Sequence, residues 1–245
     1  MSTTLIPAVH ADPTTHRDTL LRRMLTPAPV FELAGPDDAQ RQEVEAMVAE
    51  KFQTAWQARI THFLPWLMSM HCLGHCSAVA GLRPATRSGL FLEQYLQQPV
   101  DVRLSSVTGN PISRSMIVEV GNLAASQRGA SHLLFLVMTA ALHKAGYKWI
   151  AFTATKGLRN NLDKLGYPLL KLADASSQHL DEAAVAEWGR YYNSSPQVMA
   201  GSLDVAMQLI SERPLLRRVL RLYRSQINLL VDALESKESE SKGSE

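Results

Sequence analysis

The sequence predicts an α/β fold in which a mixed β-sheet is flanked by helices. Two successive strand–helix–strand patterns support this prediction: 116–126, 132–142 and 149–155, followed by 158–165 and 167–172. Connections of this kind usually join parallel strands in one sheet. A chain of 245 residues, 46% of them hydrophobic, can bury one sizeable core. We therefore expect one main domain, residues 29–210, with an appendage at each end.

The bulk composition limits the classes of partner. A net charge of +2 gives no overall bias toward nucleic acid. Cys72 and Cys76 are too few and too close for a disulfide framework, which favours a reducing, cytoplasmic compartment. The N-terminus lacks the pattern of a signal peptide, and no apolar run reaches the roughly 18–20 residues that cross a membrane. The sequence predicts a cytoplasmic protein without a nucleic-acid partner.

The first half of the chain begins with a Thr- and Pro-rich segment, residues 1–28, that we expect to be a mobile arm. A strand at 30–34 and a helix at 39–57 follow, because Gly35, Pro36 and Asp37 supply a stop and a helix cap. Two strands, 63–70 and 76–82, are joined by a hairpin turn at 72–75. A short helix at 90–96 and another that opens at Pro99 complete this half.

The central strand, 116–126, is apolar except for Glu119 and Asn122. Burying either side chain without partners costs about 1–3 kcal/mol or more, so each is expected to have a role. Glu119 is a candidate general base whose pKa burial would raise, or a structural carboxylate paired to a buried cation. Asn122 could orient the substrate or hold a developing oxyanion, or it could only form hydrogen bonds at a strand end.

The turn after this strand presents backbone N–H groups at a helix N-terminus. Arg128, Gly129, Ala130 and Ser131 form it, and small residues let a phosphate approach closely. The alternative is an ordinary helix start. Asn160 opens the next short helix and could supplement an anion site, although a solvated face explains it equally well.

Two arginines could bind the carboxylate of an acceptor. Arg83 ends a strand and Arg114 precedes the central one, and the alternative for both is a surface ion pair. The His and Cys residues at 71–76 have metal-capable atoms, but four such ligands converge poorly in a hairpin, so no metal site is predicted.

The last part of the chain changes character at residue 211. Before it come an aromatic cluster at 187–193, interpreted as core or a pocket wall, and a final strand at 197–209. Leucines at three- and four-residue steps beside a row of arginines predict an amphipathic basic helix over 211–235. It either docks on the domain or makes peripheral contact with an inner membrane. The Ser/Glu/Lys-rich tail, 236–245, is predicted to be disordered.

Four motifs resemble the bacterial family of thermostable hemolysins. They are 91–96 (FLEQYL), 117–124 (IVEVGNLA), 152–155 (FTAT) and 188–192 (WGRYY) with Pro196, and the resemblance spans roughly 30–205. More distantly, the strand–turn–helix order with 165–167 (LGY) looks like the GNAT acyltransferase superfamily and the acyl-homoserine-lactone synthases.

The distant resemblance implies a GNAT-like sheet in which the strand of Glu119 parts from its neighbour. The pantetheine arm of acyl-CoA or of an acyl carrier protein would lie in the gap, with no tightly bound cofactor. The resemblance assigns the donor to Val120, Leu123 and the turn residues, catalysis to Glu119, Asn122 and Arg83, and the substrate to Arg114, Thr153 and Trp66. The implied function is an N-acyltransferase acting on a small amine.

Three departures from the superfamily pattern keep other functions open. Ser126 stands where a Gln or Arg usually opens the phosphate loop, and Leu162 stands near the position of a frequent Tyr acid. The acidic pair of the synthases has no counterpart in 61–70, so use of S-adenosylmethionine is not implied. The alternatives are a membrane-active hemolysin-type protein and an acyl-CoA-binding module without catalysis.

Overall fold

A computed structural model describes residues 28–87, 89–126, 129–164 and 166–242. The predicted arm therefore lies almost wholly outside the described residues, and so does Arg128. The sheet has seven strands in the order β1-β2-β3-β4-β5-β7-β6. The strands are β1 Val30–Ala34, β2 Trp66–Cys72, β3 His75–Pro84, β4 Ile117–Ala125, β5 Trp149–Ala154, β6 Leu169–Asp174 and β7 Gln197–Ser202. Only β4 and β5 are paired in parallel among these strands, so the predicted mixed sheet is confirmed.

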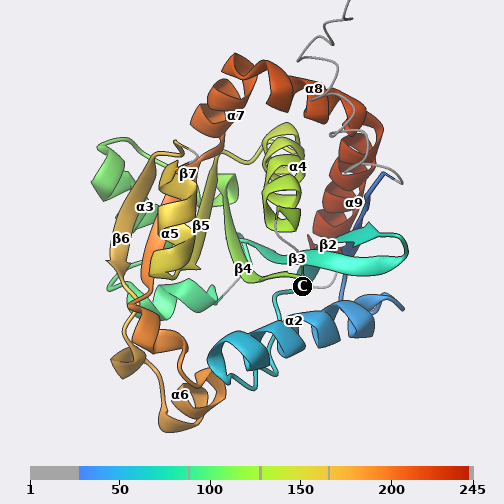
Figure 1. Cartoon of the computed structure of the whole chain (residues 1–245). Helices are drawn as coiled ribbons and strands as arrows, with labels where there is room; N and C mark the ends of the chain where they lie inside the picture. Colours follow the sequence, from blue (N-terminus) through green and yellow to red (C-terminus); the bar gives the residue numbers. More distant parts are fainter. Residues whose placement is uncertain (1–27, 88, 127–128, 165, 243–245) are drawn as a thin grey trace, which may run out of the picture.

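Helices cover both faces of the sheet (Figure 1). They are α2 Arg41–Trp56, α3 Val100–Thr108, α4 Ala130–Lys144, α5 Lys156–Lys164, α6 Glu182–Trp188, α7 Leu203–Glu212, α8 Pro214–Leu222 and α9 Arg224–Lys242, with a short 3-10 segment, η1 Phe91–Tyr95. The face that α4 covers carries the largest core, to which α7, α8 and α9 also contribute. The opposite face is divided between α2 on β2–β4 and η1 with α3 on the β5–β7 half.

Alternation along the strands separates these cores. Val118 and Val120 pack in the α4 core, whereas Ile117 and Ala151 pack beneath η1 and α3. Helix α4 is buried around most of its circumference, as its continuous apolar sequence predicts. The β2–β3 hairpin turns at Leu73 and Gly74, both with positive φ, as a two-residue hairpin requires.

Strands β4 and β5 part after a short paired stretch. Their pairing runs from Ile117 with Trp149 to Val120 with Phe152, whereas β4 continues to Ala125. On the other side of β4 the register shifts, because Gly121 faces Gly81 and Ala124 faces Val79. This β-bulge contains Asn122, whose φ of 47° lies in the left-handed region. The bulge bends β4 away from β5, as the GNAT-like resemblance implies.

The predicted strand at 197–209 is wrong beyond Ser202. The hydroxyl of Ser202 accepts a hydrogen bond from the Val205 N–H at 3.3 Å and caps α7. An apolar run that contains both a strand and the start of a helix gives no boundary signal except this serine.

The C-terminal segment also differs from its prediction. The expected single helix over 211–235 is two helices, because Pro214 starts α8 and the chain turns at Tyr223 before α9. Helix α9 continues to Lys242 where disorder was predicted. Lys237 binds Asp38 at 2.9 Å and Glu238 accepts a hydrogen bond from the Tyr147 hydroxyl, so the domain itself anchors the polar tail. Within the described residues, no helix is long and apolar enough to cross a membrane.

Helix α6 lies on the C-terminal end of α2 through a close backbone contact. The Arg59 N–H donates to the Glu187 carbonyl at 2.6 Å, and the Arg190 N–H donates to the Trp56 carbonyl at 2.8 Å. Between these bonds lies Gly189, where an added Cβ would come within 2.6 Å of the Trp56 and Gln57 carbonyl oxygens.

We therefore predict that Gly189→Ala lowers the free energy of unfolding by at least about 1 kcal/mol more than Gly74→Ala. Gly74 is the matched control because its φ of 79° is also positive but no atom lies within 4 Å of its would-be Cβ. Urea denaturation of both variants measures the difference. Equal losses of stability in the two variants would show that the α6–α2 contact accommodates the added methyl group with no extra cost in free energy.

Candidate functional site

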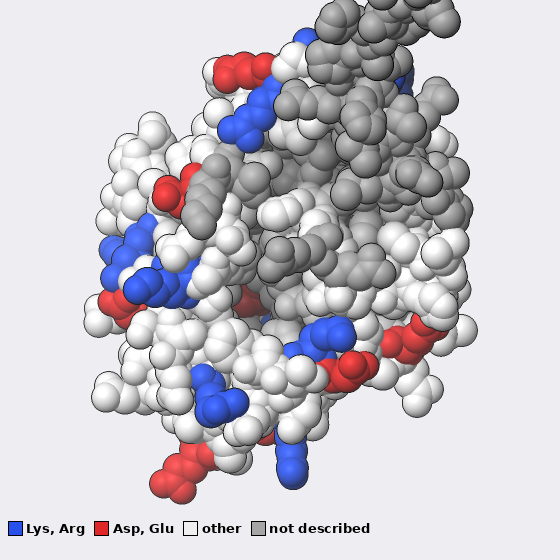
Figure 2. All heavy atoms as spheres, in the orientation of Figure 1, with Lys and Arg blue, Asp and Glu red and all other residues white. Residues whose placement is uncertain are grey.

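A cavity of about 640 Å³ occupies the place where β4 and β5 part. It passes through the sheet, because its lining includes Phe52 and Trp56 from the α2 side as well as Thr139 and Ala206 from the α4 side. Figure 2, drawn in the orientation of Figure 1, shows a hollow near the centre of the surface. The lining is mostly apolar with a few polar groups, a composition that is typical of small-molecule sites.

Glu119 is buried, with 3% of its surface exposed, and lines this cavity. Its carboxylate accepts hydrogen bonds from the N–H of Leu92 at 2.7 Å and of Phe91 at 3.1 Å, so it caps η1. Burial raises the pKa of Glu119, while these bonds and the charge of Arg83 partly oppose the rise. A carboxyl with a raised pKa at a cavity wall can exchange a proton with a ligand.

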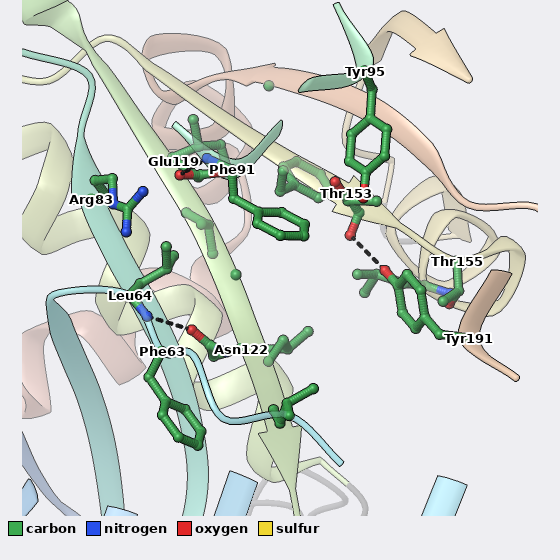
Figure 3. A pocket seen from close by; sticks show the side chains of 18 of the residues that line it. Phe63, Leu64, Arg83, Phe91, Tyr95, Glu119, Asn122, Thr153, Thr155 and Tyr191 are labelled. Atoms are coloured by element: carbon green, nitrogen blue, oxygen red, sulfur yellow. Dashed lines mark hydrogen bonds between the residues drawn. The ribbon is translucent and has the colours of Figure 1, made fainter. Parts of the chain in front are cut away.

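Arg83 lies opposite Glu119 in the β3–β4 pairing and also lines the cavity. Its Nη1 donates to the carbonyl oxygen of Gly89 at 2.5 Å. Figure 3 shows the guanidinium beside the Glu119 carboxylate. Arg83 therefore holds the backbone at Gly89 and lowers the electrostatic cost of a charged Glu119.

Asn122 is fixed by the segment that precedes β2. Its Oδ1 accepts a hydrogen bond from the Leu64 N–H at 2.8 Å (Figure 3). Arg41 of α2 holds the same segment from the other side, through bonds of 2.9 Å to the Leu64 carbonyl and 2.6 Å to the Pro65 carbonyl. Oδ1 already accepts this hydrogen bond. The Nδ2 amide of Asn122 is therefore the group that can donate a hydrogen bond to a ligand in the cavity.

An aromatic wall closes the cavity on the α2 and α6 side. The Trp188 ring lies 5.0 Å from Tyr191, 5.5 Å from Phe91 and 5.9 Å from Phe52, measured between centroids. The Tyr191 hydroxyl donates to the Thr153 carbonyl of β5 at 3.5 Å, and burial raises its pKa. The cluster at 187–193 thus contributes to the pocket wall, one of the two interpretations of its sequence.

The structure brings together all three predicted catalytic residues and separates several predicted binding residues. Six predicted residues line the cavity: Arg83, Glu119, Val120, Asn122, Leu123 and Thr153. Trp66 does not: it is 2% exposed in the α4 core, and Arg87 stacks on it at 5.2 Å. Arg114 is also outside, because its guanidinium binds Glu93 at 2.5 and 2.8 Å and Asp101 at 3.2 Å. Trp66 and Arg114 therefore lie outside this cavity, and their assignment to the substrate stays a prediction.

The described part of the predicted phosphate turn, residues 129–131, lies at the start of α4 and does not line the cavity. Gly129, with a φ of 85°, is the N-cap of α4, and no side chain caps this end. Ala130 is buried and Ser131 is half-buried. Asn160 lies exposed on α5 and does not line the cavity.

Sequence reasoning missed the residues that approach from distant segments. Phe63 and Leu64 belong to a stretch that was predicted as strand, and Phe91 belongs to a short helix with no apparent chemistry. Asp181 and Glu187 bring two further carboxylates to the lining. The only signal for them in the sequence is their proximity to the aromatic cluster.

Comparison with known proteins identifies a family and a fold. The profile of a family described as thermostable hemolysin matches residues 34–207. Among curated proteins, no match was found.

Two solved structures resemble this one at a TM-score of 0.50. One is FeeM, an N-acyl amino acid synthase from uncultured soil microbes, at 11% identity over 71% of this chain and 95% of that chain. The other is BjaI, a CoA-dependent acyl-homoserine-lactone synthase with SAM and isopentyl-CoA, at 12% identity over 82% of this chain and 90% of that chain. At this identity the likeness establishes the fold, which is the predicted GNAT-like one.

The raised pKa of Glu119 predicts a pH-dependent difference in stability from Glu119→Gln. Between the ordinary and the raised pKa the folded state binds more protons than the unfolded state, so wild-type stability falls as pH rises. The glutamine has no such titration, and its loss of one hydrogen bond is a constant offset. Urea unfolding should be measured at several pH values between about 4 and 8. The free energy of unfolding of the wild type, relative to that of Glu119→Gln, should decrease as pH rises. An advantage that grows with pH would contradict the raised pKa.

Proposed function

The chain belongs to the thermostable hemolysin family, and we propose that it is an N-acyltransferase that moves an acyl group from an acyl thioester to a small amine. The observation that carries the proposal is the buried carboxylate of Glu119 at a cavity that passes between two parted strands. The GNAT-like fold supports it, because FeeM and BjaI are both named as acyl-transferring synthases. The donor would be acyl-CoA or an acyl carrier protein.

The two halves of the cavity suit two different parts of the reactants. The half on the α4 side is aliphatic and aromatic, with Phe135, Ile150, Leu162 and Leu203 in its lining. It would take the acyl chain, because burying each CH₂ contributes about 0.8 kcal/mol. The half on the α2 side contains Glu119 and would take the amine. The thioester then lies in the gap between β4 and β5.

The reaction needs one base and one donor to the carbonyl oxygen. The amine nitrogen forms a bond to the thioester carbon while the C–S bond breaks and the thiolate leaves. Glu119 accepts the proton of the attacking amine, directly or through water. The free Nδ2 of Asn122 donates to the oxyanion, since Leu64 fixes the carboxamide orientation.

The donor's phosphates would lie at the N-terminus of α4. Gly129 has no Cβ, its would-be Cβ position is open, and Ala130 and Ser131 follow with their backbone N–H groups at the positive end of the helix. An acyl carrier protein presents a phosphopantetheine phosphate to the same groups, so both donors remain candidates.

We predict that Glu119→Gln lowers kcat/KM for acyl transfer by about 100- to 10,000-fold because the base is lost. Thermal stabilisation by acyl-CoA should persist, since the carboxylate is not assigned to the donor. Glu50→Gln, on the exposed surface of α2, is the control and should leave activity unchanged. Full activity of Glu119→Gln over panels of acyl-CoAs and amines would exclude Glu119 as the base.

We predict that Ala206→Phe shortens the acyl chain that the enzyme accepts. Ala206 lines the α4 half of the cavity from α7, so a phenyl ring there occupies space that the chain would fill. The kcat/KM for long acyl-CoAs should fall at least tenfold relative to short ones. Val205→Phe is the control, because Val205 is 39% exposed on the same helix and lies outside the cavity. An unchanged chain-length profile would place the acyl chain elsewhere.

A second candidate function is peripheral contact with an anionic membrane through α8. Leu215 and Leu222 are 51% and 65% exposed, and the exposed residues Arg217 and Arg221 lie between them in the helix. Exposed leucines beside arginines favour the interface of an anionic bilayer.

The double substitution Leu215→Ser and Leu222→Ser should weaken binding to phosphatidylglycerol-containing vesicles at least tenfold in sedimentation. Val102→Ser, a 47% exposed residue on α3, is the control. Wild-type protein that stays in the supernatant would exclude this contact, whereas vesicle leakage would favour the membrane-active alternative.

A further inference from the structure

The half of the cavity that contains Glu119 carries an excess of negative groups. Within the described lining, the carboxylates are Glu119, Asp181 and Glu187, and Arg83 is the one Lys or Arg side chain. The ion pair that the structure shows for Glu187 is with His62, at 3.8 Å. Asp181 caps α6 by accepting the Ala184 N–H at 2.7 Å. A cation that enters this half therefore meets a favourable potential.

Arg83, the one guanidinium in the described lining, lies next to a carboxylate. Its Nη1 donates to the Gly89 carbonyl, and its side chain lies beside the Glu119 carboxylate. An acceptor carboxylate placed there would lie close to a second carboxylate, and like charges at short range repel. Within the described lining, an anionic acceptor thus meets three carboxylates and one guanidinium.

The aromatic wall adds a second attraction for cations. Trp188 is tilted by 48° against Tyr191 and by 41° against Phe91, and Trp56 meets Tyr191 edge-on at 5.6 Å. Phe91 and Trp188 are partly exposed and both line the cavity. An ammonium group over such ring faces gains about 0.5–2 kcal/mol, most when it is desolvated.

We propose that the acceptor is a cationic amine without a carboxylate, bound between the aromatic wall and the carboxylates of Asp181 and Glu187. This inference rests on the proposed acyltransferase function and specifies its acceptor. The ammonium enters as a cation and loses one proton to Glu119, which frees the nitrogen lone pair to attack the thioester carbon. The nitrogen loses its second proton as the C–S bond breaks, and this proton passes to the departing thiolate. The product is a neutral fatty amide, which no longer fits a cation site and so leaves it readily.

The test compares matched acceptors that differ by one carboxylate: 2-phenylethylamine with phenylalanine, and tryptamine with tryptophan. With a long-chain acyl-CoA as donor, we expect kcat/KM to be at least tenfold higher for each amine than for its amino acid. Glu187→Gln should raise the KM for the amines at least threefold and leave kcat largely unchanged. Glu182→Gln is the control, because Glu182 lies exposed on the same helix and outside the cavity.

Calorimetry with the amines and amino acids separates failure of this inference from failure of the proposed function. If neither class is acylated but the amines bind more tightly and Glu187→Gln weakens that binding at least threefold, the cation site stands and the transferase proposal falls. A preference for the amino acids, equal binding of both classes, or no binding of the amines would overturn the inference.

Discussion

The parting of β4 from β5 is the constraint on which the rest of the structure depends. A strand that leaves its neighbour inside an apolar interior exposes N–H and C=O groups that must find other partners. Here Tyr191 donates to the Thr153 carbonyl, and Arg159 donates to the Ala154 carbonyl at 2.9 Å. Asn122 accepts the Leu64 N–H at the bulge. Side chains therefore bind carbonyl groups at the end of β5 and fix the segment before β2 against β4.

The same constraint explains why Glu119 has two tasks. The carboxylate holds the N–H groups of Phe91 and Leu92, so it positions the segment that roofs the cavity as well as facing the cavity itself. Protonation of Glu119 weakens its role as a double acceptor. In the proposed reaction, protonation of Glu119 would therefore loosen η1 and, through the contact of Phe91 with Trp188, change the aromatic wall.

The sequence predicted those features in which one residue differs in polarity or backbone freedom from its neighbours. A carboxylate and a carboxamide stand out in the apolar β4, and Gly74 marks a hairpin whose turn requires positive φ. The sequence did not show that Trp66 and Arg114 lie outside the cavity, because their partners, Arg87 for the first and Glu93 with Asp101 for the second, are set by tertiary packing. The aromatic wall combines segments near residues 52 and 188, and no local pattern reports that they meet.

The first described strand lies against the last described helix in the folded domain. Gln226 of α9 bonds to the Phe31 N–H at 2.8 Å and to the Pro29 carbonyl at 3.0 Å, across nearly 200 residues of sequence. The α4 core therefore remains incomplete beside β1 until α9 has been synthesised and has packed. During translation the nascent chain cannot finish this core on the ribosome while α9 is still in the exit tunnel. Until α9 has packed, apolar surface of β1 and α4 in this core is left uncovered.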